Sequence, residues 1–236
     1  MSVDFGETWA YESIVTALPG IDLSRGAAVA LQIVLFEVVI LLAAWYYGLW
    51  AAALAGTAAV FVAAVGSVEM LRISTLVRAE ALPESYRRLL FGSSIEVVLG
   101  VLAYVALVTH LFVFDPQRSA EPLLSALGAD ESFVVVYVML LVLWDVCYRI
   151  GTGWWYSITA LWRSLRYRFD DRTARALRRA DLENIGFGML QLLLLPFVAG
   201  EPVLAAVLVG HVAAVAAVSG ASVLVLTVRR GRLSPT

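Results

Sequence analysis

The sequence predicts an all-α polytopic membrane protein with six transmembrane helices and with both termini in the cytoplasm. Three observations support this prediction. Hydrophobic residues make up 61% of the 236 positions and charged residues 15%, whereas a soluble domain is about half apolar and a quarter charged. Apolar stretches long enough to cross a bilayer recur six times. The arginines are gathered in the segments between these stretches.

A helix that crosses the hydrocarbon core needs about 20 mostly apolar residues. The predicted spans are residues 27–47, 50–71, 90–114, 133–150, 184–199 and 203–228. The fifth span is short and contains Pro196, which predicts a kink or an early exit. These spans form a transmembrane domain over residues 26–228, between an interfacial segment (1–25) and a cytoplasmic tail (229–236).

The orientation follows from the basic residues, which are all arginine apart from two histidines. Most of them lie in residues 72–88, 163–179 and 229–232, whereas the loop over residues 115–131 carries only Arg118 among four acids. Cationic loops are retained in the cytoplasm, so the three clusters predict cytoplasmic termini. Arginine without lysine, with abundant alanine and valine, is typical of high-GC prokaryotic genes. We therefore expect a multi-pass protein of a prokaryotic plasma membrane.

The segments outside the spans have patterns of their own. Tyr11, Ile14, Val15 and Leu18 follow helical spacing, which predicts a short amphipathic helix on the inner membrane surface. After the fourth span, four aromatic side chains predict an interfacial belt: Trp154, Trp155, Tyr156 and Trp162. The alternating charges of residues 171–183 predict a solvated helix. The arginines nearby either bind anionic lipid headgroups or only set the topology.

Short matching words predict a threefold repeat of a two-helix unit. Glu37, Glu96 and Gln191 each stand within an aliphatic run of an outward-going helix, and the partner helices end with Arg72, Arg149 and Arg229. Because each unit has an even number of spans, the three hairpins would run in the same sense about an axis normal to the membrane. Chance agreement between short, low-complexity words is the alternative explanation.

The repeated polar residues are candidates for an ion or proton site. A carboxylate in the hydrocarbon core costs a few kcal/mol, so such residues usually face the bundle interior and are often functional. Glu37 and Glu96 have no basic residue within one turn of their own helix. Together with Gln191 they offer oxygen ligands for a hard cation, or groups that carry a proton.

A second set of candidates lies near the inner ends of the spans. Asp145 and Arg149 are four residues apart, so they share a helix face and can form an ion pair. Glu69 is expected beside Arg72 at the inner interface. These four residues are candidates for an inner gate. His211 is a further candidate in the outer half, because Gly210 and Ala214 place it on a closely packed face.

We therefore predict a small ion channel or carrier that moves a cation or proton. A non-catalytic membrane scaffold is the first alternative, and an enzyme that modifies lipids with Asp145, Arg149 and Cys147 is the second. The chain has no zinc-protease, phosphate-binding or serine-hydrolase motif, so we expect no cofactor and no nucleic-acid partner. The expected partners are the lipid bilayer, anionic lipids at the cytoplasmic arginines, and another copy of the chain or another membrane protein.

Overall fold

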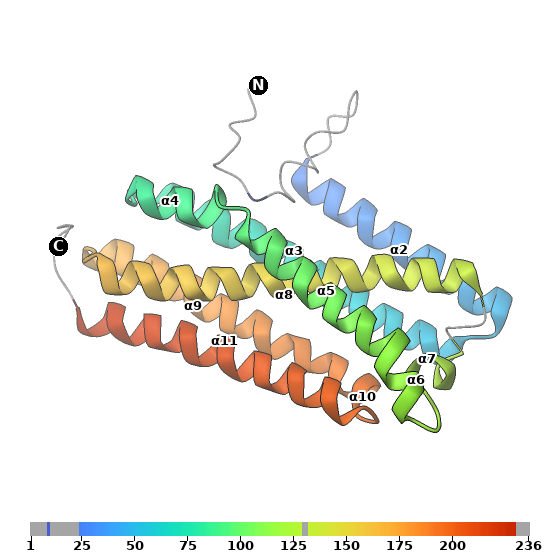
Figure 1. Cartoon of the computed structure of the whole chain (residues 1–236). Helices are drawn as coiled ribbons and strands as arrows, with labels where there is room; N and C mark the ends of the chain where they lie inside the picture. Colours follow the sequence, from blue (N-terminus) through green and yellow to red (C-terminus); the bar gives the residue numbers. More distant parts are fainter. Residues whose placement is uncertain (1–8, 10–23, 129–131, 230–236) are drawn as a thin grey trace.

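The computed structural model describes Trp9, residues 24–128 and residues 132–229. Within these residues, six helical segments are long and apolar enough to cross a membrane, which confirms the prediction of a multi-pass membrane protein. Figure 1 shows the segments running side by side along the long axis of the molecule.

The segments follow the order of the predicted spans. They are α2 (Arg25–Tyr47), α3 (Trp50–Ala79), α5 (Ile95–Thr109) continued by the π-helix η1 (His110–Phe114) and α6 (Asp115–Arg118), α8 (Phe133–Arg166), α9 (Asp171–Leu190) continued by the 3₁₀-helix η2 (Gln191–Leu194) and α10 (Leu195–Val198), and α11 (Pro202–Val228). Two short helices complete the described chain: α4 (Glu84–Phe91) and α7 (Leu123–Ala126).

The two ends of the bundle differ in charge. At the arginine-rich end lie α4, the end of α3, the end of α8 and the start of α9. At the arginine-poor end lie the turn between α2 and α3, the helices α6, α7 and α10, and the start of α11 (Figure 1). The turn at Gly48 needs glycine, because its φ of 75° lies in the left-handed region. Its N–H donates to the Ala44 carbonyl and closes α2.

Helix α8 is the centre of the bundle. It packs against α2, α3, α4, α5, α9 and α11, while α9 also packs against α3 and α11. Helices α5 and α8 approach each other closely, since a Cβ atom at Gly151 would lie 2.6 Å from the Gly100 backbone nitrogen. Glycine at both positions therefore allows the two backbones to touch.

The helices at the arginine-rich end continue well beyond the predicted spans. Helix α8 has 34 residues, about 51 Å at 1.5 Å per residue, whereas the hydrocarbon core is only about 30 Å thick. Its extension packs with α3, α4 and α9 around a hydrophobic core that includes Tyr86, Trp155, Tyr156 and Leu177. The third span also differs, since its helix starts at Ile95 after a break and α4 is separate.

Two expectations for this end need correction. Trp155 and Tyr156 are buried in the core and do not form an interfacial belt. The start of α9 is not a solvated helix, because Ala174, Leu177 and Asp181 are buried between neighbouring helices. These positions are three and four residues apart, the spacing of one helix face, whereas the charged side chains between them point outward.

The three predicted hairpins are adjacent helix pairs, because α2 packs on α3, α5 on α8, and α9 on α11. Their surroundings differ, however, since α8 contacts all the other long helices. The threefold repeat therefore stays a prediction. The predicted amphipathic helix over Tyr11–Leu18 and the tail after Arg229 lie outside the described residues.

Candidate functional site

A large cavity runs along α8 in the arginine-poor half of the bundle. Its volume is about 740 Å³, and it is lined from α2, α3, α5, η1, α6, α7, α8, η2, α10 and α11. On α8 the lining extends from Val135 to Ile150, which corresponds to about 22 Å of helix. Nearly all of the lining side chains are aliphatic or aromatic.

Only four lining side chains carry a titratable group: His110, Arg118, Cys147 and His211. His110 is the first residue of the π-helix η1, a type of segment that is frequent at functional sites. Its Nε2 atom lies 3.7 Å from Glu201 Oε2, and both side chains are largely buried. This contact connects the end of the third span to the start of the sixth. The ring of His211 packs near the indole of Trp154, with centroids 6.2 Å apart.

Arg118 lies at the rim of the cavity. Its guanidinium is 5.3 Å from the centre of the Phe114 ring, a cation–π contact. The preceding Asp115 is buried, and its Oδ2 accepts a hydrogen bond of 2.7 Å from the Leu123 N–H. That bond fixes the turn between α6 and α7, the segment that carries Arg118.

The three residues predicted to share an ion site lie in different helix interfaces. Glu37 accepts a hydrogen bond of 2.8 Å from Thr57, between α2 and α3. Glu96 is only 1% exposed and lies where α5 meets α8. Gln191 is 2% exposed and stands in η2, which packs against α3 and α11. None of the three lines the large cavity. Their convergence on one site stays a prediction.

The structure does bring Asp145 and Arg149 together. Arg149 Nη2 donates to Asp145 Oδ1 at 2.7 Å, and Nη1 approaches the Met70 sulfur at 3.6 Å. Arg149 is buried, and its side chain packs on Gly66 of α3, where a Cβ atom would lie 2.7 Å from the Arg149 Cδ. The absence of a side chain at Gly66 therefore makes room for the arginine.

Arg72 pairs with a carboxylate of a neighbouring helix, and Glu69 lies close by. Arg72 donates to Glu183 Oε1 of α9 at 2.6 Å, and Arg179 donates to the same atom at 3.0 Å. The Glu69 carboxyl is near Glu183 and near both arginines. Two carboxyls and two arginines thus connect α3 to α9 at the start of the arginine-rich end.

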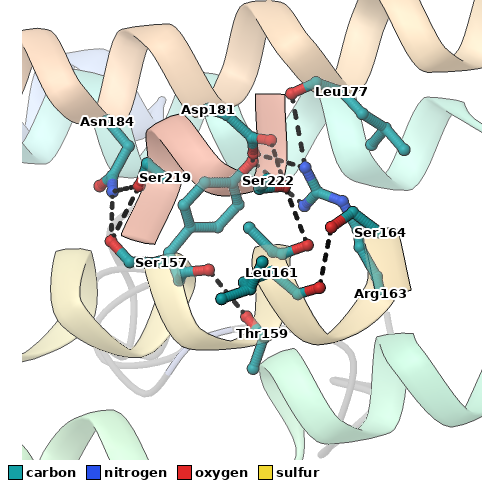
Figure 2. Close-up of polar contacts among 12 residues, drawn as sticks. Ser157, Thr159, Leu161, Arg163, Ser164, Leu177, Asp181, Asn184, Ser219 and Ser222 are labelled. Carbon is teal, nitrogen blue, oxygen red and sulfur yellow. Dashed lines mark hydrogen bonds and ion pairs between the residues drawn. The ribbon is translucent and has the colours of Figure 1, made fainter. Parts of the chain in front are cut away.

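A buried polar cluster at this end was not predicted as a site. Arg163 and Asp181 form an ion pair that is fully buried. Arg163 also donates to the Tyr86 hydroxyl at 2.6 Å, and Asp181 accepts from Tyr156 at 2.8 Å and from Ser222 at 2.7 Å. Figure 2 shows the side chains of Asp181 and Ser222 turned toward the Arg163 guanidinium. The cluster therefore connects α4, α8, α9 and α11.

A second set of hydrogen bonds lies one turn further along the same helices. The Asn184 amide donates to Ser157 at 2.9 Å and to Ser219 at 3.2 Å, and Ser219 donates to Ser157 at 3.0 Å (Figure 2). Because these groups satisfy one another, we assign both sets to the packing of α8, α9 and α11. The sequence signal is the serine pair Ser219 and Ser222, in an otherwise apolar helix.

The described residues offer little for metal or covalent chemistry. Among them, no three His, Cys, Asp or Glu side chains are close enough to hold a metal ion together. Cys147 is buried against apolar neighbours of the cavity. The cavity can instead enclose an apolar molecule along α8, with polar side chains in contact with it at only a few positions.

Comparisons with known proteins give a family without an assigned activity. No curated protein and no solved structure matches the chain. Residues 4–222 match a family model, and this match covers most of the chain. The protein therefore belongs to the family described as "Family of unknown function (DUF7530)".

Proposed function

We propose that the protein binds a lipid-like molecule in the cavity along α8. The observation that carries this proposal is the cavity itself, with a volume of about 740 Å³ and an almost entirely apolar lining. Ligand pockets usually have volumes of about 300–1,000 Å³ and are lined mainly by apolar side chains with a few polar groups. Water gains little in such a space, whereas an alkyl or isoprenoid chain gains contacts along its whole length.

The position of the cavity also favours a ligand taken from the membrane. Phe114 on η1 and Val203 and Val207 on α11 line the cavity, yet each is more than 40% exposed. These side chains therefore contribute both to the cavity and to the outer surface of the bundle. Helices α5 and α11 are not among the closely packed pairs, although both pack on α8. A chain that lies in the bilayer can enter between them.

Photolabelling tests this proposal. A photoreactive probe with a twelve-carbon alkyl chain is expected to label α8 between Met139 and Cys147 saturably in purified protein. In the double variant Ala55→Phe/Ala103→Phe, two lining alanines are enlarged, so saturable labelling is expected to fall strongly. The control is Leu54→Phe/Leu102→Phe, which enlarges adjacent residues that face away from the cavity and are 64% and 61% exposed. Unsaturable labelling, or equal labelling of both variants, would exclude a ligand cavity.

A second candidate function is the movement of a proton or cation past Glu37. The specific observation is that this carboxyl has a hydroxyl partner, Thr57, on the neighbouring helix. Glu37 stands about halfway along α2, and we therefore expect it near the middle of the membrane. A hydrogen bond between acid and hydroxyl suits a group that gains and loses a proton. Asp145 and Arg149 would then act as a gate. Glu37→Gln should change ion flux in reconstituted vesicles, and equal flux from both proteins would clear Glu37 of this role.

We also propose a membrane location and an orientation for the protein. We place the arginine-rich end in the cytoplasm of a prokaryotic cell, at the plasma membrane, because cationic segments are retained on that side. Exposed arginines such as Arg88 and Arg175 are then available to anionic lipid headgroups. Association with another copy or with another membrane protein is compatible with the exposed small residues of α11, including Ala206 and Gly210.

A further inference from the structure

The cavity lining has one side chain of fixed charge, the cation of Arg118. The lining also includes two histidines, but no Asp or Glu. Arg118 and His110 belong to the arginine-poor end, where η1 passes into α6. A chain placed along α8 with its head at this end would therefore meet these two side chains first. A cationic head would find no carboxylate in the lining.

Arg118 is the residue whose position most needs an explanation. It is the one arginine of the 115–131 segment, whereas the other loop arginines lie at the opposite end. Among the described residues, no carboxylate lies within ion-pair distance of its guanidinium, although Asp115 and Glu121 are close in the sequence. Asp115 is instead turned inward to the Leu123 N–H. The ring of Phe114 holds the guanidinium at 5.3 Å, which leaves its N–H donors available at the rim.

His110 supplies a second donor. The side chain is 15% exposed and its Nε2 is 3.7 Å from Glu201, which is not in the lining itself. Glu201 thus lies beside the imidazole, outside the cavity lining. The π-helix that begins at His110 gives this turn of the third span a rotation different from that of a regular α-helix, and so determines where the ring points.

We propose that the ligand is an anionic amphiphile, with a carboxylate or phosphate headgroup at Arg118 and His110 and its chain along α8. This inference rests on the proposed binding of a lipid-like molecule. A planar guanidinium binds the oxygens of a carboxylate or phosphate in a bidentate manner, with stronger hydrogen bonds than a neutral group would form. A long-chain fatty acid and a lipid phosphate share this chemistry.

The test uses four probes with the same twelve-carbon chain: dodecanoate, dodecyl phosphate, dodecanol and dodecyltrimethylammonium. Each probe competes with the photoreactive probe for the protein in nanodiscs of phosphatidylcholine. We expect the two anions to compete about tenfold more tightly than dodecanol, as charge-assisted hydrogen bonds predict. The ammonium probe should compete most weakly. Tighter competition by the phosphate supports a lipid phosphate, and tighter competition by the carboxylate supports a fatty acid.

Arg118→Gln should remove most of the preference for anions while dodecanol competes as before, and His110→Gln should reduce the preference in part. The matched control is Arg88→Gln, which changes an exposed arginine at the other end of the bundle and should leave the preference for anions unchanged. Equal competition by dodecanol and both anions in the wild type would overturn the anionic headgroup but leave lipid binding intact. If none of the four probes competes, both the headgroup and the lipid cavity are wrong.

Discussion

At the scale of single residues, the arginines differ in burial and in what their ion pairs contribute to stability. Arg88 is exposed and pairs with Glu84 in the same way as many surface ion pairs, which contribute little to stability. Arg163 is fully buried, and its charge is compensated by Asp181 and by the hydroxyls of Tyr86 and Tyr156. Removal of one partner from such a pair leaves an uncompensated buried charge, which is expensive.

We therefore expect Asp181→Asn to lower the free energy of unfolding by about 3–5 kcal/mol, because Arg163 loses its counter-charge. The thermal unfolding midpoint in detergent measures the effect. Glu84→Gln removes a carboxylate from an exposed arginine, and its midpoint should stay close to that of the wild type. Similar midpoints for the two variants would show that the buried pair has no special weight.

Asp170 gives a pH-dependent prediction, because it caps the start of α9. Its carboxylate accepts hydrogen bonds that lower its pKa below the usual value, and the bond from the Thr173 backbone N–H has the largest effect. Its contribution is thus complete above the unfolded-state pKa and is lost as the pH falls through the lower pKa of the folded state. The protection factors of the Arg172 and Thr173 amides, measured relative to intrinsic exchange at each pH, should fall over that acidic range. Asp170→Asn should lack this pH dependence, and an identical pH profile in both proteins would contradict the assignment.

At the scale of elements, contact between helices depends on where glycine occurs. Gly151 and Gly100 allow α8 and α5 to touch, whereas at Gly186 of α9 an added Cβ atom would meet nothing within 4 Å. The same substitution should therefore have opposite effects at the two kinds of position. Alanine favours a helix over glycine by about 1 kcal/mol, but only where the additional methyl group has room.

Gly151→Ala should destabilise the protein by about 1–3 kcal/mol, because the methyl group would lie 2.6 Å from the Gly100 nitrogen and separate the two helices. Gly186→Ala is the control and should leave the protein equally stable or slightly more stable. Unfolding by heat or by SDS in mixed micelles measures both. A stabilised Gly151→Ala protein would mean that α5 and α8 are further apart than described.

At the scale of the whole molecule, the bundle has two dissimilar halves. The arginine-rich half is filled by the extended helices and their buried polar cluster, whereas the arginine-poor half encloses the cavity. This division is consistent with a protein whose arginine-rich half is closely packed and whose arginine-poor half binds a ligand. The proposed orientation then places the cavity in the outer leaflet.

Cysteine labelling in intact cells tests that orientation. Ser125→Cys, at the arginine-poor end, should react with a membrane-impermeant maleimide added outside. Ser85→Cys, at the arginine-rich end, should react only after the cells are opened; both residues are exposed. Arg168→Cys, an exposed position between α8 and α9 at the same end, should behave as Ser85→Cys does. Labelling of Ser85→Cys from outside would reverse the proposed orientation.

The local sequence pattern determined the number of membrane spans and one of the ion pairs. The number of spans follows from apolar stretches of sufficient length, and the Asp145–Arg149 pair follows from a spacing of four on one helix. Both depend only on residues that are close in the chain. The aromatic belt was wrong for Trp155 and Tyr156, because an amphipathic pattern does not say whether a protein or a lipid covers the apolar face.

Tertiary structure alone decided which distant residues meet. Arg72 pairs with Glu183, and Arg163 pairs with Asp181, because the packing of α3 and α8 on α9 sets those distances. The cavity has no sequence signature, since its lining comes from helices along the whole chain and consists of ordinary apolar residues. Whether such residues fill a space or surround one depends on how the helices diverge around α8, which no single segment determines.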